Sequence, residues 1–382
     1  MNNRTFIFAG GGTGGHIYPA VAVAEQLLKL RPGAKIQFFC SSRGIDTQIL
    51  GKTGFKYTAL PAKGFSIRPA DLPAFIGSFL KSYRIARQAL SESTNAIVIG
   101  IGGFVAAPVC LAAHKLKVPI ALLNIDSVPG RANKIIARWA DEIFLQFEDT
   151  AQYFTKCRAK LSVVGCPLRE GFSSPQPHKA IEELGLDKNK KVLLITGASS
   201  GAENINTAIC SLLEKLNVFA DNWQIVHLAG TANYEKVKSG YASAKIPHKV
   251  LGYYDDMPDL LAAADLVVGR SGAVSVAECA AAAVPTICIP YPYHKDKHQY
   301  LNARKLVDAG AAVIVDDLPD KQQTAERLWT QLQALMKDND EREKMRQNAR
   351  RITGTQAGAK IAEALLRLGN FSLTCTGLKR II

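Results

Sequence analysis

Short, continuous apolar runs alternate with amphipathic stretches along most of this 382-residue chain, and this alternation constrains the fold more than any other feature. Runs without polar interruption are typical of parallel strands that helices cover on both faces. Two of the stretches between them, Pro19–Leu30 and Phe75–Leu90, have helical patterns. The alternation predicts a doubly wound α/β fold. The strands predicted in the first half are Thr5–Ala9, Lys35–Cys40, Ala96–Ile99, Ile120–Asn124 and Glu142–Leu145.

The same alternation starts again in the second half, after a segment at 165–177 that is rich in proline, glycine and serine. Such a segment is typical of a domain boundary. We therefore predict two Rossmann-like domains, at residues 1–166 and 167–365, with a cleft between them. Residues 366–382 are assigned as a C-terminal tail; Asp320–Leu368 is expected to be strongly helical, and Gly369–Ile382 has little pattern. The strands predicted in the second domain are Lys191–Thr196, Gln224–Ala229, Lys249–Gly252, Leu266–Gly269, Thr286–Ile289 and Ala312–Val315, and its helices include Asn204–Leu216, Ser275–Ala283 and Gln299–Asp308.

The net charge is +14, and residues 1–166 contain 20 Lys and Arg against 9 Asp and Glu, so most of the excess lies in the first domain. Such an excess predicts a negatively charged partner: nucleic acid, an anionic membrane or a phosphorylated substrate. No nucleic-acid-binding motif accompanies it, so we expect no nucleic acid partner. The cysteines are scattered without a CxxC pair, which favours reduced, cytosolic thiols and no metal site. No segment has the roughly 20 apolar residues that cross a bilayer.

Two glycine-rich loops follow predicted strands of the first domain. In the first, Gly10–His16, backbone N–H groups and the start of a helix near Pro19 favour an anion. It is not a Walker A loop, because no Gly-Lys-Ser/Thr follows. The alternative is a tight strand-to-helix turn without a ligand. The second, Gly100–Phe104, is either another wall of the same cleft or a close packing turn between a helix and a strand.

Two segments of the second domain have similar features. Gly269–Glu278 follows a strand and opens a helix, which offers another anion site. Glu278 lies one to two turns into that helix, where it could accept hydrogen bonds from a vicinal diol such as a ribose, or be a solvated surface residue. Tyr291–Tyr300 is polar and aromatic and follows a strand, where open α/β sheets bind ligands. Its charged side chains are equally compatible with an ordinary surface loop.

A third candidate surface lies on the helical stretch Phe75–Leu90. Its residues Phe75, Phe79 and Leu80 can share one face, with Lys81, Arg84 and Arg87 close by. An apolar patch ringed by cations favours adsorption onto anionic lipid. The alternative is an ordinary helix packed on the sheet.

A set of short motifs resembles the MurG family of GT-B glycosyltransferases, bacterial N-acetylglucosaminyltransferases that convert lipid I into lipid II. The resemblance implies an enzyme of peptidoglycan synthesis, peripheral to the cytoplasmic face of the cell membrane. The motifs span about residues 5–365 in the family's order, at Gly11–His16, Gly100–Phe104, Val128–Asn133, Gly165–Arg169, Asp255–Met257, Arg270–Ala273 with Glu278, His298–Gln299 and Asn302–Ala303.

This resemblance also implies roles for particular residues. The backbone of Tyr254 would hold the uracil of UDP-GlcNAc, Glu278 would take the ribose hydroxyls, and the loop 270–275 would meet the diphosphate. His16 matches the family's histidine in the acceptor-side loop. The remaining positions that match donor contacts or close over the reaction centre are Thr13, Gly14, Gly15, Asp126, Arg169, Ser199, Arg270, Ala273, Val274, Ser275, Val276, Ala277, His298 and Gln299.

Two segments depart from the family's pattern. Leu123–Asp126 stands where the family usually has His-Glu-Gln-Asn, so Asn124 replaces the usual Glu and Asp126 the usual Asn. Gly197–Ala202 reads Gly-Ala-Ser-Ser-Gly-Ala instead of Gly-Gly-Ser-Gln-Gly-Ala. The exchange of acid and amide keeps one carboxylate, and it is also compatible with a different acceptor.

The resemblance implies an inverting transfer in which His16 or Asp126 takes the proton of the acceptor hydroxyl. The helix start at Ser271–Ser275, together with Arg169, would stabilise the departing UDP. We expect neither a metal nor a cofactor. Three other interpretations stay open: a GT-B transferase with another lipid or small acceptor, a UDP-sugar epimerase, and a membrane-associated binding protein that has lost catalysis.

Overall fold

The computed structural model describes residues 4–64, 68–93, 95–197, 201–352 and 356–375. It divides the chain into two compact units, one of Met1–Arg169 with Gln356–Ile382 and the other of Glu170–Thr355. The predicted boundary after residue 166 lies close to the observed one. We expected residues 356–365 in the second domain, whereas in the structure this part of the chain belongs to the first unit.

The first unit is built on a seven-stranded parallel sheet with the order β3-β2-β1-β4-β5-β6-β7. The chain reverses its direction across the sheet between β1 and β4, and open α/β sheets bind ligands beyond the carboxyl ends of strands at such a point. The first predicted glycine-rich loop follows β1, whereas the second, Gly100–Phe104, forms the end of β4 and the start of α4 without a loop between them. The strands are β1 (Thr5–Gly10), β2 (Lys35–Ser41), β3 (Lys56–Leu60), β4 (Ala96–Gly102), β5 (Ile120–Asn124), β6 (Glu142–Leu145) and β7 (Lys160–Val163).

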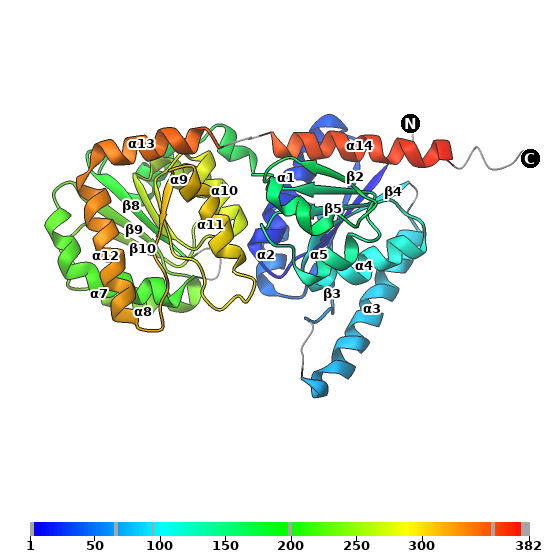
Figure 1. The fold of residues 1–382 in the computed structure, drawn as a ribbon, viewed down its shortest axis with the longest axis horizontal. Helices are drawn as coiled ribbons and strands as arrows, with labels where there is room; N and C mark the ends of the chain where they lie inside the picture. The colour runs from blue at the N-terminus through cyan, green and yellow to red at the C-terminus, as the bar shows by residue number, and fades with distance from the viewer. Residues whose placement is uncertain (1–3, 65–67, 94, 198–200, 353–355, 376–382) are drawn as a thin grey trace, which may run out of the picture. The chain divides into compact units, whose positions relative to one another are not determined.

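Helices cover this sheet (Figure 1). The first of them begins at Gly14, not near Pro19 as predicted, so Pro19 lies inside the helix. As the sixth residue of α1, this proline cannot donate the usual helical hydrogen bond to the Gly15 carbonyl. The helices of the unit are α1 (Gly14–Leu30), α2 (Gly44–Gly51), α3 (Leu72–Ser91), α4 (Gly103–Lys115), α5 (Arg131–Ile136) and α14 (Ala357–Cys375).

The C-terminal helix α14 corrects the prediction that the chain has little pattern from Gly369. It continues to Cys375 and packs along α1. Gly358 allows this approach, because a Cβ there would lie 3.3 Å from the Gln26 side chain. Arg4 Nη1 donates a hydrogen bond of 2.7 Å to the carbonyl of Leu366, which ties the helix to the start of the chain.

The second unit contains a six-stranded parallel sheet with the order β10-β9-β8-β11-β12-β13, and all six predicted strands are present. Its reversal lies between β8 and β11. The strands are β8 (Lys191–Thr196), β9 (Trp223–Leu228), β10 (His248–Leu251), β11 (Leu266–Gly269), β12 (Thr286–Cys288) and β13 (Ala312–Ile314). The helices are α6 (Pro177–Leu184), α7 (Glu203–Leu216), α8 (Tyr234–Gly240), α9 (Met257–Ala263), α10 (Ala273–Ala281), α11 (His298–Asp308), α12 (Lys321–Lys337) and α13 (Asn339–Arg350).

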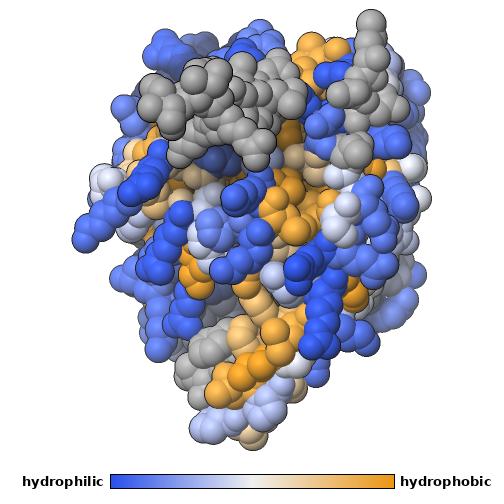
Figure 2. Space-filling view, turned by 90° about the vertical axis from the view of Figure 1, so that its right-hand side faces the viewer, coloured by the Kyte–Doolittle hydropathy of each residue, from blue (hydrophilic) through white to orange (hydrophobic). Residues whose placement is uncertain are grey.

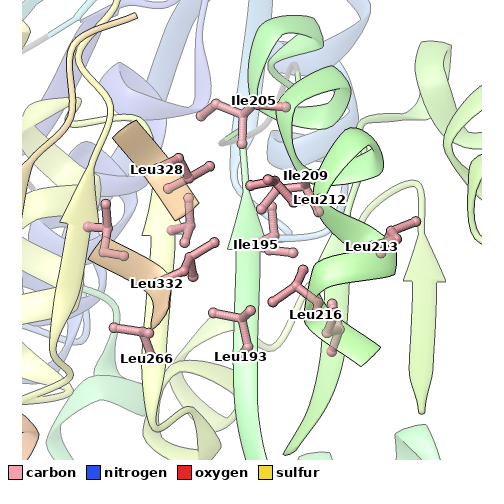
Figure 3. Close-up of a cluster of buried hydrophobic side chains, with 14 of the residues drawn as sticks. Leu193, Ile195, Ile205, Ile209, Leu212, Leu213, Leu216, Leu266, Leu328 and Leu332 are labelled. Atoms are coloured by element: carbon pink, nitrogen blue, oxygen red, sulfur yellow. The ribbon is translucent and has the colours of Figure 1, made fainter. Parts of the chain in front are cut away.

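A buried aliphatic cluster holds the strands next to this reversal in place (Figure 3). Leu193 and Ile195 of β8 meet the apolar stripe of α7, on which Ile209, Leu212 and Leu216 recur at helical spacing. Full burial of such a side chain stabilises the fold by about 1.5–3 kcal/mol. The cluster therefore gives the loops beyond β8 and β11 a rigid base.

Candidate functional site

The first glycine-rich loop is held by the protein's own carboxylate. Asp46, on α2, is fully buried and accepts hydrogen bonds from the N–H of Gly12 at 2.8 and 2.9 Å. Arg43 Nη1 donates to the Gly12 carbonyl at 2.9 Å. The expectation that the glycine amides face a ligand anion is therefore wrong for Gly12, whose N–H has an internal partner. Gly14 and Gly15, which open α1, stay as candidate donors.

His16 lies beside the second glycine-rich loop, so the structure brings the two loops together. A Cβ at Gly102 would lie 3.1 Å from His16 Nε2 and 3.2 Å from Asn133 Oδ1. The backbone of Gly102, with φ +96° and ψ −175°, is almost restricted to glycine. On the other side of the ring, His16 Nδ1 lies 3.1 Å from Thr13 Oγ1. The ring is therefore held between a hydroxyl and the second loop.

Asp126 belongs to a hydrogen-bonded turn beyond β5. Asn124 is buried, and its amide donates to the Asp126 carbonyl at 2.9 Å. Its Oδ1 accepts from Asn133 Nδ2 at 2.8 Å. An amide can donate and accept in this way, whereas an ionised Glu could only accept. Asn133 thus donates to Asn124, in the turn of Asp126, and also lies beside Gly102, the residue that packs against His16.

Arg169, the last residue of the segment Met1–Arg169, packs on a side chain in the second turn of α1. Its guanidinium carbon lies 4.4 Å from the centre of the Tyr18 ring. A cation at this distance is attracted by the face of the ring. Tyr18 therefore places the charge of Arg169 near the first turns of α1.

In the second unit, Arg270 forms an internal ion pair. Its Nη2 lies 2.8 Å from Asp317 Oδ2, with side-chain exposures of 10% and 1%. Its Nη1 donates to the carbonyls of Ile289 and Pro290 at 3.0 and 3.3 Å. Asn204 Nδ2 donates to the other oxygen of Asp317 at 2.9 Å. A contact of Arg270 with a diphosphate stays a prediction, and its observed partners are internal.

The helix start predicted as an anion site is present at α10. Gly272 caps the helix and has no side chain that could accept a hydrogen bond from its first turn. Ser271 is fully buried, and its Oγ has no hydrogen-bond partner in the described part of the chain. Asn302 of α11 donates to the Ser271 carbonyl at 3.3 Å. Glu278 lies half-buried further along α10, after Ala273, Val274, Ser275, Val276 and Ala277.

The loop before α11 fixes the two predicted residues at its end. Gln299 Oε1 accepts from the N–H of Tyr291 at 3.0 Å, and His298 Nδ1 donates to Asp296 Oδ1 at 2.7 Å. Partial burial raises the pKa of Asp296, but the hydrogen bonds from His298 outweigh it and bring that pKa below its ordinary value. His298 also stacks on His294 with ring centres 4.3 Å apart.

The phenol of Tyr254 donates to Glu183 at 2.9 Å, and burial together with this bond raises the pKa of Tyr254. A backbone contact of Tyr254 with the uracil stays a prediction. Ser199 lies outside the described residues. Within the residues that are described, no group of three or more His, Cys, Asp or Glu side chains could hold a metal ion.

The first turns of α3 extend away from the rest of their unit and expose apolar side chains (Figures 1 and 2). Leu72, Ile76 and Leu80 are 43%, 48% and 46% exposed. The rings of Phe75 and Phe79 pair at 6.1 Å. We call the exposed face formed by Leu72, Phe75, Ile76, Phe79 and Leu80, together with Lys81 and Arg84, the α3 patch. The sequence prediction missed Leu72 and Ile76. None of the helices in the described ranges is long and apolar enough to cross a membrane.

Sequence reasoning also missed the residues that orient the predicted site: Asp46, Asn124, Asn133 and Asp317. Asn133 was part of a motif, but its contact with Asn124 was not predicted. The only signals were a lone acid in a short helix for Asp46 and an amide ending an apolar strand for Asn124. Neither signal names its partner.

Two doubly wound parallel-sheet units fit the GT-B fold, and family models identify the chain as a glycosyltransferase. Residues 6–145 match the glycosyltransferase family 28 N-terminal domain, and residues 192–365 match the glycosyltransferase family 28 C-terminal domain. The crystal structure of Acinetobacter baumannii MurG has a TM-score of 0.71 at 25% identity and covers 96% of this chain and 100% of its own.

Curated relatives are similar to this chain over nearly its full length and theirs. The UDP-N-acetylglucosamine--N-acetylmuramyl-(pentapeptide) pyrophosphoryl-undecaprenol N-acetylglucosamine transferase of Halothermothrix orenii is 36% identical, over 91% of this chain and 94% of its own length. The protein of the same name from Caldicellulosiruptor saccharolyticus is 35% identical over 95% and 98%. The chain therefore belongs to the MurG family within glycosyltransferase family 28. A putative UDP-N-acetylglucosamine 2-epimerase from Listeria monocytogenes, at 14% identity and a TM-score of 0.70, shares the fold alone.

Proposed function

We propose that this glycosyltransferase moves GlcNAc from UDP-GlcNAc to lipid I, undecaprenyl-diphospho-MurNAc-pentapeptide, and so makes lipid II for peptidoglycan. The observation that carries the proposal is identity above 30% over nearly the whole length of relatives named for this transfer. An epimerase is not favoured, because the epimerases among the similar structures are alike in fold only.

The second unit would bind the donor. The first-turn amides of α10 and the buried Ser271 hydroxyl offer hydrogen bonds to a diphosphate, and the positive end of the helix dipole favours its charge. Glu278 would accept hydrogen bonds from both ribose hydroxyls, and the backbone of Tyr254 would meet the uracil. His298 and Gln299, already oriented by Asp296 and Tyr291, would contact the sugar.

The first unit would supply the base. The acceptor 4-hydroxyl attacks the anomeric carbon, the bond from that carbon to UDP breaks, and UDP leaves with the electron pair, which inverts the centre to a β-1,4 bond. When Nδ1 of His16 carries its proton and donates to Thr13, Nε2 is the basic nitrogen that can take the hydroxyl proton. Asp126 is the second candidate. The α10 N-terminus and Arg169 would stabilise the leaving diphosphate without a metal.

The test measures UDP release with purified full-length protein. We expect release with lipid I and none without it, and a loss of at least ~100-fold in kcat for His16→Ala with donor affinity little changed. An unchanged kcat would remove His16 from the mechanism, and the same loss in Asp126→Asn would assign the base to Asp126. Epimerised sugar without acceptor, or no donor binding at all, would overturn the proposal.

The α3 patch would seat the enzyme on the cytoplasmic face of an anionic membrane. Exposed apolar side chains beside Lys81 and Arg84 suit such a surface, and residues 1–166 carry most of the excess positive charge. In vesicle sedimentation, Ile76→Glu should weaken binding to phosphatidylglycerol vesicles several-fold. The matched control is Val218→Glu, which places the same charge at an exposed apolar residue of the second unit. Equal effects of the two changes would refute the α3 patch as the membrane surface.

A further inference from the structure

The fully buried carboxylate of Asp46 lies under the first glycine-rich loop and is not among the residues expected to touch substrate. It accepts from the N–H of Gly12, from the N–H of Ser41 at 2.9 Å and from the Ser41 hydroxyl at 2.6 Å. Buried carboxylates are costly unless hydrogen-bonded, and these donors satisfy both oxygens. Asp46 therefore joins the end of β2 to the loop that follows β1.

The fit between Asp46 and the loop is tight. A Cβ on Gly11, which has a φ of +142°, would lie 2.2 Å from Asp46 Oδ2, so the carboxylate occupies the space that a side chain would need. Arg43 holds the carbonyl of Gly12 while Asp46 holds its N–H. Both polar groups of this residue are thus fixed by one segment, 43–46, immediately before Thr13 and the start of α1.

We propose that Asp46 is a positioning residue that sets the loop geometry for the reaction. Its carboxylate binds the N–H of Gly12, the amide nearest β1 at which a substrate anion could bind. A substrate anion therefore has to bind the later amides, at Gly14 and Gly15. Asp46 also fixes the stretch that leads into His16. A displacement of about 1 Å at a reacting group can cost ~100-fold in rate, so a loosened loop lowers turnover more than donor binding. The inference rests on the proposed function.

The perturbation is Asp46→Asn in the full-length enzyme. One oxygen becomes an NH2 group, which then faces the N–H of Gly12 or Ser41 donor to donor. We expect kcat to fall at least ~10-fold while KM for UDP-GlcNAc stays within about 3-fold, since the predicted donor contacts lie mainly in the second unit. Hydrogen exchange of the peptide spanning Gly10–Ile17 should become faster.

Glu142→Gln is the matched control. Glu142, on β6 of the same unit, is also buried and accepts from Lys160 Nζ at 3.1 Å and Ser162 Oγ at 2.8 Å. It should lose thermal stability but keep kcat within about 2-fold, with exchange at Gly10–Ile17 unchanged.

Two outcomes would overturn the inference: an Asp46→Asn enzyme with kcat within about 2-fold of the wild type, or a loss of kcat that Glu142→Gln shares. If Asp46→Asn does not fold, Ser41→Ala removes only the hydroxyl donor, and we expect about a 2- to 5-fold fall in kcat. If the wild type itself transfers nothing to lipid I, the proposed function fails. The exchange data then decide separately whether Asp46 fixes the loop, and unchanged exchange would refute it.

Discussion

Replacement of Asp317 by alanine removes one partner of the buried ion pair with Arg270. This pair connects the ends of three strands, because Arg270 follows β11, its carbonyl partners at 289 and 290 follow β12, and Asp317 follows β13. Asn204 brings α7 into the same network. The substitution therefore tests whether this network holds the donor-side loops together.

The expected magnitude follows from what the substitution leaves behind. Breaking a buried ion pair costs about 3–5 kcal/mol, since the remaining charge stays desolvated and unpaired. Arg270 keeps two carbonyl acceptors and 10% exposure, so we expect a loss near the lower end, about 3 kcal/mol. The control is Asp308→Ala, which breaks the exposed pair of Arg304 and Asp308, 48% and 56% exposed, and should change stability by less than about 1 kcal/mol.

Urea unfolding followed by tryptophan fluorescence measures this difference. Two of the three tryptophans, Trp223 and Trp329, belong to the core of the second unit, so the signal follows mainly the unit that carries the change. The reasoning fails if Asp317→Ala loses no more stability than Asp308→Ala. UDP affinity adds a second readout. A weaker affinity in Asp317→Ala agrees with Arg270 as an internal clamp, whereas an unchanged or tighter one would favour a direct contact of Arg270 with the diphosphate.

Two further predictions concern single residues. Burial lowers the pKa of His227 to about 3. The unfolded chain therefore binds a proton at His227 as the pH falls below about 6.5, whereas the folded chain stays neutral there. The contribution of His227 to the free energy of unfolding is fully present above pH 6.5 and falls by about 1.4 kcal/mol per pH unit below it. Urea midpoints at pH 7, 6 and 5 should show this slope in the wild type, and a weaker slope in His227→Gln; parallel profiles would contradict it. Gly102→Ala should cost about 1–3 kcal/mol of stability through its backbone conformation and also lower kcat by pressing on His16, which thermal melts and turnover would measure. Full turnover in this variant would contradict the crowded geometry.

The interior strands were predictable because each is a continuous apolar run, buried on both faces. The edge strands β3 and β7 were missed for the opposite reason. Most residues of Lys56–Leu60 and all of Lys160–Val163 are exposed or half-buried, with polar residues among the apolar ones, so neither resembles a core strand. The position of α14 was also out of reach, because its return to the first unit depends on packing against α1, more than 300 residues earlier in the chain.

The loops of the site were predictable from glycines that follow strands, but their internal partners were not. Asp46 reaches Gly12 across 34 positions of sequence, and Asn204 reaches Asp317 across 113. A single acidic residue forms no periodic pattern, and no rule of sequence spacing predicts such a distant partner. The departure at Asn124 shows the same limit: in sequence it only replaces the family's usual Glu, whereas its contacts assign it to the turn that carries Asp126.

These internal carboxylates change what the excess positive charge can do. Asp46 takes the N–H of Gly12, and Asp317 neutralises Arg270, so part of each apparent anion site is already satisfied within the protein. A diphosphate on α10 would then be held mostly by neutral amides and the Ser271 hydroxyl, and Arg169 of the first unit would add a single positive charge. Salt screens exposed charges strongly and such short hydrogen bonds weakly. Raising ionic strength should therefore reduce binding of the α3 patch to anionic vesicles far more than binding of UDP. A parallel loss of both would mean that exposed cations carry the donor affinity after all.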